Sequence, residues 1–514
     1  MKTVLLFLLF TSLIHSQQQV DIPWQTLANS PWPMIAHDPQ ITGRSPYSGP
    51  KTPTIKWTLD LPYGVYSGPI IGEDGTLYVG TNAYLYFMGD TTNYFYAIDP
   101  DNGRIIWTFL TGTPFANESG YLINNEGTIF FGSQSGWLYA IDTKGNLKWK
   151  YDTGGNIHQR VMNTDLQGNI YIANSTGYLF SFSKEGRLNW KANYGGGLFP
   201  RSVSFSPDGN TIYTTGKGSN LYALNLDGSL KWYLECPGDR RLPLLIDNNG
   251  NIIFLAGCTP PWSLTSIDSL GNLNWEYVIN NNNANFTESS PAMDYEGNIY
   301  YTYVADSAGV VWYSRLESVD YYGNYRWTYQ FDQPEEVIVM PLICDKDGTV
   351  YCGSTFGYNY YAVSKDGELL WQIPLEGYYV ENSTAIASDG TLYIGKCLYS
   401  TFTQGVKTLI AIQDTGSTSV SQSSIEASDY SLSQNYPNPF NATTHIKYSI
   451  PQSGKVKLTV YNLMGSEVAR ILDIYQGAGS YDVTFQPKDL ASGIYFYTLT
   501  SGNFTTTKKL ILLK

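Results

Sequence analysis

The chain is poor in the residue types that build metal and redox centres. Its 514 residues include five Cys and four His, and no two cysteines stand in a Cys-x-x-Cys arrangement. One histidine, His15, lies in the N-terminal segment that we assign below to a signal peptide. The remaining histidines are His37, His158 and His445, in three separate regions. Metal sites and histidine-dependent nucleophiles need several such groups close together. The sequence therefore predicts no metal site, no cofactor and no histidine relay.

The odd number of cysteines leaves at least one thiol without a partner in the chain. Cys236 and Cys258 each follow a predicted strand, and they are the best-placed pair for a disulfide. Cys344 and Cys352 flank one predicted hairpin and would lie diagonally, a poorer geometry for a bridge. The pairing of the five cysteines stays open.

Charge and long apolar runs are scarce too. Charged residues make up 15% of the chain, 31 basic against 44 acidic, and no basic block suggests a nucleic-acid partner. One apolar run, at 4–14, follows Lys2 and precedes Ser16 and Gln17, as in a secretory signal peptide. We assign the signal to residues 1–19. No other run approaches the roughly 20 residues of a membrane-spanning helix, so we expect an exported protein without a membrane span after signal removal.

What the chain has in abundance is one repeated unit. A strand that follows a Gly occurs eight times, at 75–78, 127–130, 168–171, 209–213, 250–254, 297–300, 348–351 and 390–393. A second alternating strand such as Tyr139-Ala140-Ile141-Asp142 and a Gly turn follow, and then a Trp. Successive Trp residues are 41 to 52 positions apart. This period predicts four-stranded antiparallel blades, and hence an all-β, eight-bladed β-propeller.

The ends of the repeat array predict how the ring closes. The last copy, near Ile412, lacks its Trp, whereas one additional Trp-bearing strand, Ile55-Lys56-Trp57, precedes the first Gly strand. A final blade that takes this N-terminal strand would join the two ends of the ring by backbone hydrogen bonds.

The repeat of residues 55–414 resembles that of the pyrroloquinoline-quinone (PQQ)-type eight-bladed propellers, which include quinoprotein alcohol dehydrogenases. The preceding residues 20–54, with Trp32-Pro33-Met34 and His37-Asp38-Pro39-Gln40, resemble the leader segment of such propellers. A catalytic member of that family needs an acidic base and calcium ligands around the quinone, and often has vicinal cysteines. We do not find this set here, so the resemblance predicts the fold but favours a protein that is not an enzyme.

The chain changes character after the propeller. Residues 415–428 are rich in Ser, Thr and Gln, as in a linker. Residues 429–514 contain alternating strands at 445–450, 455–461, 481–485, 494–499 and 508–513, which predict an immunoglobulin-like β-sandwich.

Residues 429–514 also resemble the C-terminal sorting domain of type IX secretion (Por secretion system) substrates. The resemblance lies in 434–441, 460–462, the pair Ala478-Gly479, 490–497 and the final lysines, and its sorting motif contains Tyr436, Pro437, Asn438, Pro439, Phe440 and Gly493. It implies export by the general route, followed by recognition by the type IX machinery. The product would be secreted or attached to the outer surface. Whether the domain is cleaved stays open.

Two recurrent features have structural explanations. The Asp-Gly and Asn-Gly turns resemble calcium loops but lack the later bidentate Glu, so we interpret them as hairpin turns. The Trp that repeats once per blade is expected to pack between blades. Trp137, Trp262 and Trp312 stand outside that pattern and are better candidates for exposed contacts.

A candidate ligand site follows from aligning the blades. Eight or nine residues before the strand-opening Gly, where the innermost strand begins, six blades carry a charge: Glu118, Arg160, Arg201, Arg241, Glu288 and Glu381. These side chains should surround one mouth of the central channel. Three long loops on the same face, at 84–93, 305–315 and 397–407, contribute aromatics including Trp312 and Tyr313. The alternative is a set of solvated loops whose charges neutralise one another.

The sequence thus predicts a non-catalytic binding module for an extracellular polysaccharide or surface protein. One alternative is an enzyme, either quinone-dependent or acting on polysaccharide through carboxylates such as Glu118 and Glu288. A scaffold for outer-membrane assembly, like periplasmic propellers of this repeat type, is disfavoured because a periplasmic resident needs no sorting domain.

Overall fold

The computed structural model describes residues 18–513 except for a set of short segments. Outside the described residues lie 1–17, 63, 66, 82–92, 112–119, 158–161, 195–202, 217–219, 236–243, 257–261, 280–283, 287–289, 308–310, 332–336, 339–340, 355–358, 375–383, 397–407, 416–419, 424–429, 442, 452–453, 477–478, 488–489, 503 and 514. The chain forms two compact units, Met1–Gln413 and Asp414–Lys514. No helix able to cross a membrane occurs within this part of the chain.

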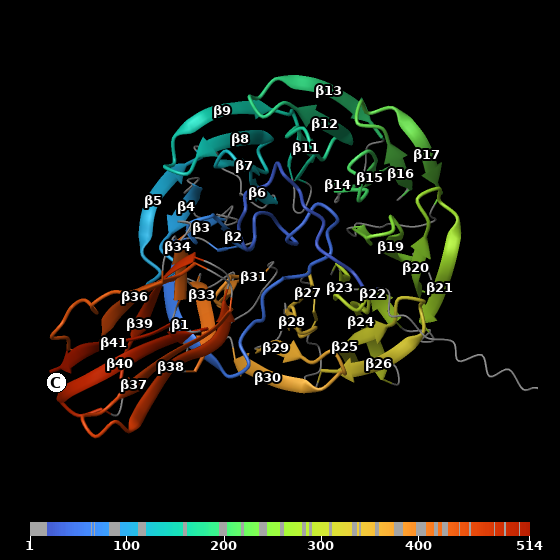
Figure 1. Cartoon of the computed structure of the whole chain (residues 1–514). Helices are drawn as coiled ribbons and strands as arrows, with labels where there is room; N and C mark the ends of the chain where they lie inside the picture. Colours follow the sequence, from blue (N-terminus) through green and yellow to red (C-terminus); the bar gives the residue numbers. More distant parts are fainter. Residues whose placement is uncertain are drawn as a thin grey trace, which may run out of the picture. The chain divides into compact units, whose positions relative to one another are not determined.

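The first unit is a ring of antiparallel sheets around a central axis (Figure 1). Blades 1 to 4 contain β2 (Ile70–Ile71), β3 (Leu77–Gly80), β4 (Tyr94–Ile98) and β5 (Ile105–Leu110); β6 (Tyr121–Ile123), β7 (Thr128–Gly132), β8 (Trp137–Asp142) and β9 (Leu147–Asp152); β10 (Asn163–Thr164), β11 (Ile170–Ala173), β12 (Tyr178–Phe182) and β13 (Leu188–Asn193); and β14 (Val203–Phe205), β15 (Ile212–Thr215), β16 (Leu221–Leu224) and β17 (Leu230–Leu234). In each blade the strands run outward from the axis in sequence order.

The remaining blades repeat this plan, except that blade 8 takes its outermost strand from the N-terminal part of the chain. Blade 5 contains β18 (Leu245–Ile246), β19 (Ile252–Ala256), β20 (Trp262–Ile267) and β21 (Leu273–Ile279); blade 6, β22 (Ala284–Phe286), β23 (Ala292–Met293), β24 (Ile299–Ser307), β25 (Val311–Val319) and β26 (Tyr325–Gln330); blade 7, β27 (Ile343–Cys344), β28 (Val350–Gly353), β29 (Asn359–Val363) and β30 (Leu369–Pro374); blade 8, β31 (Ala385–Ile386), β32 (Leu392–Gly395), β33 (Thr408–Asp414) and β1 (Pro53–Asp60). In blade 6, β22 and β23 both pair with β24.

The N-terminal strand closes the ring, as the sequence predicts. Strand β1 lies beside β33 as the outermost strand of blade 8. The side chain of Thr408 in β33 donates a hydrogen bond of 2.8 Å to Asp60 in β1. The prediction of an all-β propeller with eight blades and an N-terminal closing strand is therefore confirmed.

The repeated Trp residues join each blade to the next, which confirms their predicted packing role. Seven indole Nε1–H groups donate to a backbone carbonyl in the adjoining blade at 2.8 to 3.1 Å; they belong to Trp57, Trp107, Trp149, Trp190, Trp232, Trp275 and Trp327. The eighth, Trp371, donates at 2.7 Å to the carbonyl of Pro50, just before β1 of blade 8. The ring of Trp149 also covers Gly186, where a Cβ atom would lie 2.6 Å from the indole. Gly186 has a φ of 88°, so glycine satisfies both the turn and the close approach.

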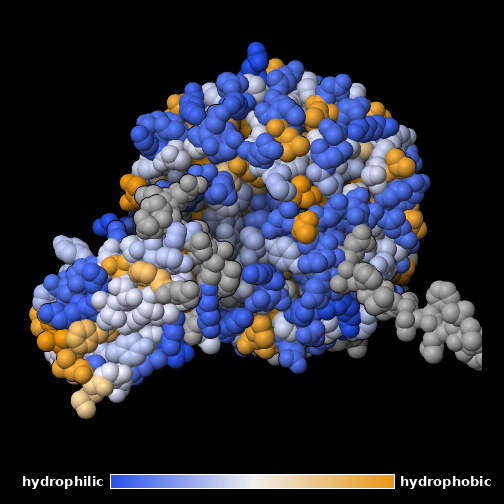
Figure 2. Space-filling model, viewed as in Figure 1, coloured by the Kyte–Doolittle hydropathy of each residue, from blue (hydrophilic) through white to orange (hydrophobic). Residues whose placement is uncertain are grey.

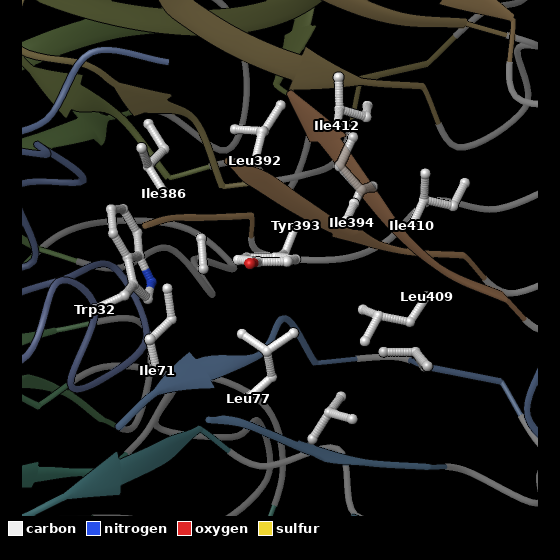
Figure 3. Packing of buried hydrophobic residues seen from close by; sticks show 14 of the residues in the cluster. Trp32, Ile71, Leu77, Ile386, Leu392, Tyr393, Ile394, Leu409, Ile410 and Ile412 are labelled. Atoms are coloured by element: carbon white, nitrogen blue, oxygen red, sulfur yellow. The ribbon is translucent and has the colours of Figure 1, made fainter. Parts of the chain in front are cut away.

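The core continues across the point of closure. One buried cluster combines residues of the segment before β1, of blade 1 and of blade 8 (Figure 3). In it, Trp32 lies near Ile71 of β2 and Ile386 of β31, with Leu392 and Tyr393 of β32 beyond them. The first and last blades are therefore held by apolar packing as well as by strand pairing.

The second unit is a sandwich of two four-stranded sheets. One has the order β34 (Val420–Ser423), β39 (Gly479–Phe485), β36 (Thr444–Ile450), β35 (Ser431–Leu432), and the other β38 (Glu467–Gln476), β37 (Gly454–Tyr461), β40 (Gly493–Ser501), β41 (Phe504–Leu512). Alternate residues of both sheets, such as Ile446, Val483, Leu458 and Tyr497, are buried in one core. Period-two patterning of this kind is what buries one face of each sheet.

Candidate functional site

The segment before β1 crosses the centre of the propeller (Figure 1). We call residues 18–50 the leader. It lies against the ends of the innermost strands that lead into the short Gly turns, as at Phe205, the last residue of β14 before the turn at Gly209. The leader therefore occupies the end of the axis on the face of those turns, which we call the turn face. The connections on the opposite face, the loop face, contain most of the residues outside the described set.

The leader binds one blade after another through its backbone carbonyls. The carbonyls of Trp32 and Pro33 accept from Ile71 in blade 1 and Ile123 in blade 2. Those of Pro39, Gln40, Thr42 and Gly43 then accept from the amides of Phe205, Ile246, Met293 and Cys344, in blades 4 to 7. Pro39 also accepts from the side chain of Asn163 in blade 3, at 3.0 Å. The backbone amides at these strand ends would otherwise need water as a hydrogen-bond acceptor, and the carbonyls of the leader take that place.

This path requires unusual backbone conformations. Ala36, His37 and Ile41 have φ values of 59°, 76° and 58°, in the left-handed region that L-residues, and β-branched ones above all, disfavour. Their neighbours hold them there: Gly43 N–H donates to Ala36 O, and Ile41 N–H to Asp38 O. The local strain is offset by the bonds that the leader makes to the blades.

A buried arginine ties the start of the leader to blade 6. Arg44 is 2% exposed, and its Nη2 donates to Val20 O at 3.0 Å while its Nε lies 3.5 Å from the Asp21 carboxylate. The guanidinium also lies over the ring of Tyr295, 4.6 Å from the centroid, and Tyr295 Oη donates to Asp21. An arginine so enclosed is stable only when its donors are paired.

Asp38 lies at the turn of the leader and accepts hydrogen bonds from the backbone amides of Gln40 and Thr42 and from the hydroxyl of Thr42. Burial by itself would raise the pKa of Asp38, but His37, whose Nδ1 is 3.6 Å away, and the charge of Arg44 bring it below its ordinary value. Asp38 is therefore a charged, structural carboxylate that shapes the leader.

Most of the predicted channel-mouth residues cannot be placed. Glu118, Arg160, Arg201, Arg241, Glu288 and Glu381 all lie outside the described residues, and so do the predicted loops at 84–92 and 397–407. The cysteines Cys236, Cys258 and Cys397 lie there as well, whereas Cys344 and Cys352 are described and buried. The charged ring stays a prediction.

The predicted loop at 305–315 is wrong for most of its length. Ala305 pairs with Tyr313 and Asp306 with Trp312, because β24 and β25 extend as a long hairpin with only 308–310 between them. Tyr313 is half-buried, and the side chain of Trp312 is outside the described set. The alternation of the sequence there is that of paired strands, not of a loop.

The described part of the loop face carries a row of aromatic residues. Tyr94, Trp137, Tyr178 and Trp262 each open the third strand of a blade, in blades 1, 2, 3 and 5, and all four are half-buried. In two adjacent blades a lysine of the outer strand covers the ring: Lys150 Nζ lies 4.5 Å from the centroid of Trp137, and Lys191 Nζ 5.4 Å from that of Tyr178. The sequence predicts Trp137 and Trp262 as candidates for exposed contacts. Tyr178 was missed, although its position directly after Gly177 could have indicated it.

The acidic turns have structural roles. In the turn that begins at Asp165, one carboxylate oxygen accepts from the amides of Gln167 and Asn169, and the other accepts from the hydroxyl of Tyr171. Asp294 and Asp345 repeat this pattern with Tyr300 and Tyr351. Because their oxygens bind the turn itself, we interpret these residues as elements of the fold.

One buried carboxylate was missed by the sequence reasoning. Glu317 of β25 is buried and accepts from the hydroxyls of Tyr301, Tyr303 and Thr328. The sequence feature that could have indicated Glu317 is an acidic residue within a largely apolar strand. The hydroxyl cage satisfies the carboxylate and leaves it no geometry for acid or base catalysis on an outside substrate.

The residues predicted as a sorting motif are hydrogen-bonded to the last strand of the second unit. Phe440 is buried, its amide donates to Ile511 O at 3.0 Å, and its carbonyl accepts from Leu513 at 2.8 Å. Asn438 Oδ1 accepts from Ile511 N–H at 2.9 Å. Gly493 opens β40 opposite Leu512. The peptide bonds before Pro437 and Pro439 are cis.

Tyr436 in contrast faces outward, with 81% of its surface exposed. It borders a shallow depression of about 330 Å³, lined also by Ser433, Gln434, His445 and Lys447. The predicted motif residues thus divide into buried supports, such as Phe440, and an exposed aromatic.

Two family models match parts of the chain. One, described as a secretion system C-terminal sorting domain, matches residues 434–513, and the other, described as outer membrane protein assembly factor BamB, matches residues 49–197. No curated protein matches the chain significantly.

Similar solved structures include BamB from Moraxella catarrhalis, with 12% identity, a TM-score of 0.49 and coverage of 70% of this chain and 100% of that one. Another is the Dos1 propeller, with 9% identity, a TM-score of 0.49 and coverage of 70% and 95%.

Proposed function

We propose that this chain, a protein with a BamB-type repeat propeller and a type IX sorting domain, is a non-catalytic binding module that works outside the cell. The sorting domain makes it a protein secreted by the type IX system to the cell surface or the extracellular space. Within that destination, we infer that the propeller binds an extracellular polysaccharide or a surface protein on its loop face.

The observation that carries this proposal is the position of the leader. It covers the turn-face end of the axis and uses the strand-end amides of successive blades. A ligand that approaches the axis from the turn face would have to displace those bonds. The loop face has no such cover among the described residues, and ligand sites on rigid scaffolds favour the loop side.

The aromatic row supports the same face. Half-buried rings such as Trp137 and Tyr178 present an apolar surface with a fixed orientation, and Lys150 and Lys191 lie over them. Aromatic anchors with adjacent polar or charged groups are typical of sugar and peptide contacts. The predicted charges at Arg160, Arg201 and Arg241 would add an anion-attracting arc beside this row.

The test is binding of the purified secreted protein to arrays of glycans and of outer-membrane and extracellular proteins. We expect specific binding that falls at least tenfold when Arg160, Arg201 and Arg241 are all replaced with Ala. A matched variant removes three exposed cations of the turn face, Arg104, Lys144 and Lys346, and should bind like the original chain.

Equal losses in both triple variants would show a general charge effect and contradict the proposed face. Oxidation of alcohols in a dye-linked assay, on addition of calcium and pyrroloquinoline quinone, would contradict the non-catalytic function.

The match of residues 49–197 to the BamB family favours one other candidate, a role in assembling outer-membrane proteins. This candidate requires the chain to work in the periplasm, whereas the sorting domain directs it outward. Fractionation of the producing cells distinguishes the two: a surface or extracellular location supports binding outside, and a stable periplasmic pool in complex with assembly factors supports the alternative.

A further inference from the structure

One end of the sorting domain exposes large apolar side chains. Leu463 and Met464 form the tip of the turn between β37 and β38 and are 70% and 88% exposed. Ile494, at the start of β40, and Leu513, just after β41, are 41% and 53% exposed. We call these four residues the apolar end. Figure 2 shows apolar surface gathered on this domain.

Strand register brings the four residues to the same end of one sheet. Tyr461 pairs with Phe496, so the turn that follows Tyr461 lies beyond the start of β40. Ile494 pairs with Ile511, and Leu513 is two residues further along the same face of β41. The opposite face of these strands carries the buried residues Tyr495, Leu510 and Leu512. The side chains of the apolar end therefore lie on the outer face of the sheet and do not belong to the buried core.

The sorting motif holds this end in place from inside. Phe440 and Asn438 form hydrogen bonds with the backbone of Ile511 and Leu513. These bonds hold the exposed end of β41 in position. Because Phe440 is buried, a partner cannot read its side chain directly. Apart from the exposed ring of Tyr436, what the motif presents to a partner is the surface that it supports.

The charge of the domain adds a second property. Residues 430–514 contain eight Lys and Arg against four Asp and Glu, whereas the whole chain has a formal charge of -13. Lys509 pairs with Phe496 on the outer face of β41, next to the apolar end. An apolar surface with a basic border favours a partner that is apolar at its centre and acidic around it.

We propose that the apolar end is the docking surface of this chain for the type IX secretion machinery, whose recognition site is apolar with an acidic border. This inference rests on the export function assigned to the sorting domain. Large apolar side chains that cluster on the surface of a secreted domain promote aggregation unless a partner covers them. Met and other large apolar side chains are also enriched at the centre of protein interfaces.

The experiment measures secretion of the full chain in a bacterium with an active type IX system. The double variant Leu463→Asp with Met464→Asp, and separately Leu513→Asp, place a charge in the apolar end. A control variant, Thr505→Asp, changes an exposed position on the same strand eight residues away, on the order of 25 Å. We expect the first two variants to accumulate in the periplasm, with secretion lowered at least tenfold, and the control to be secreted normally.

Two reference measurements make each outcome decisive. The melting temperature of each purified variant should stay within a few degrees of the original, because the changed residues are exposed; if it falls, Leu463→Ser with Met464→Ser replaces the Asp pair as the test. A chain without residues 430–514 should not be secreted at all.

Normal secretion of the Asp variants together with loss in the truncated chain would overturn the docking surface but not the export function. Secretion of the truncated chain would overturn the export function itself. If the original chain is a dimer that the variants dissociate while secretion continues, the apolar end is a contact between copies and the proposal is wrong.

Discussion

At the scale of single residues, the propeller depends on pairs of Trp and Gly between blades. The indole of one blade fills the space above a Gly turn of the next and donates to its backbone, as Trp149 does at Gly186 and Lys184. These contacts combine a hydrogen bond with a close approach that only a residue without Cβ permits. The sequence period of Trp and Gly therefore encodes the interfaces between blades as well as the strands.

Replacing Gly186 with Ala tests this pairing. The new Cβ would meet the Trp149 ring, and Ala would be strained at a φ of 88°, so the free energy of unfolding should fall by about 3 kcal/mol. Gly154→Ala is the matched control: its φ is 74°, but nothing lies within 4 Å of its Cβ position, so only about 1 kcal/mol should be lost. Equal losses in urea unfolding would mean that the Trp contact contributes nothing.

Buried tyrosines give the protein a pH limit on the alkaline side. Burial raises the pKa of Tyr213 and of Tyr497 to about 12, against about 10 in an unfolded chain. Each neutral phenol thus contributes stability that is fully present below pH 10 and is lost as the pH rises through 12.

An ultraviolet titration of tyrosinate should therefore show a cooperative step above pH 10 that coincides with loss of the folded circular-dichroism signal. The same titration in denaturant should be smooth and centred near pH 10. A smooth curve in the folded protein, with its β-signal retained, would show that these phenols are accessible.

At the scale of elements, the leader differs most from an ordinary N-terminal extension. Its sequence has no repeating pattern. Its hydrogen-bond partners lie up to about three hundred residues away, as in the bond from the Cys344 amide to the Gly43 carbonyl. Arg44 and Asp38 are buried within it, where charged groups are rare unless they are paired. The leader is thus a folded part of the propeller.

Removal of the Arg44 guanidinium tests the importance of the leader. Arg44→Met keeps the length of the side chain but loses the bond to Val20 and leaves Asp21 without its cation, so we expect a loss of about 2 kcal/mol in the free energy of unfolding. Arg104→Met, at an exposed turn residue, should change the same quantity by less than about 0.5 kcal/mol. A negligible effect of Arg44→Met would indicate a leader that is only loosely attached.

The start of the mature chain is a second prediction about this element. Gln19 is buried, its amide donates to Tyr295 O at 2.8 Å, and its side-chain oxygen accepts from Asn248 at 3.0 Å. We propose that the signal is removed before Gln19, earlier than the boundary of 1–19 suggested by composition. Mass spectrometry of the secreted protein should find Gln19 or an earlier residue at the start of the chain; a chain that begins at Val20 or later would contradict this.

The strands were predictable from the sequence because Gly turns and period-two alternation are local signals. The site was less so. The leader could not be traced, since its contacts are long-range backbone bonds that no side-chain pattern records. The sequence predicts 305–315 as a lengthened connection between the second and third strands of a blade, whereas backbone pairing between β24 and β25 holds most of these residues in a hairpin. The predicted charges such as Arg160 lie outside the described residues and stay predictions.

At the scale of the whole molecule, the chain combines a closed ring with a separate sandwich that has its own core. Strand β1 and the leader both come from the N-terminal part of the first unit, so the same segment closes the ring and covers one end of its axis. The sandwich shares no core residue with the propeller among the described residues. Export and the proposed binding therefore belong to different units.

We propose that a ligand binds the loop face of the propeller and leaves the turn face, which the leader covers, unchanged. Hydrogen–deuterium exchange of the secreted protein, with and without the polysaccharide or protein that the arrays identify, measures both faces in one experiment. We expect new protection in peptides that contain the connections at 112–119, 158–161, 195–202 and 236–243, and unchanged exchange in the leader and in the turns at Gly127, Gly168 and Gly209. Protection confined to the leader and those turns would contradict it.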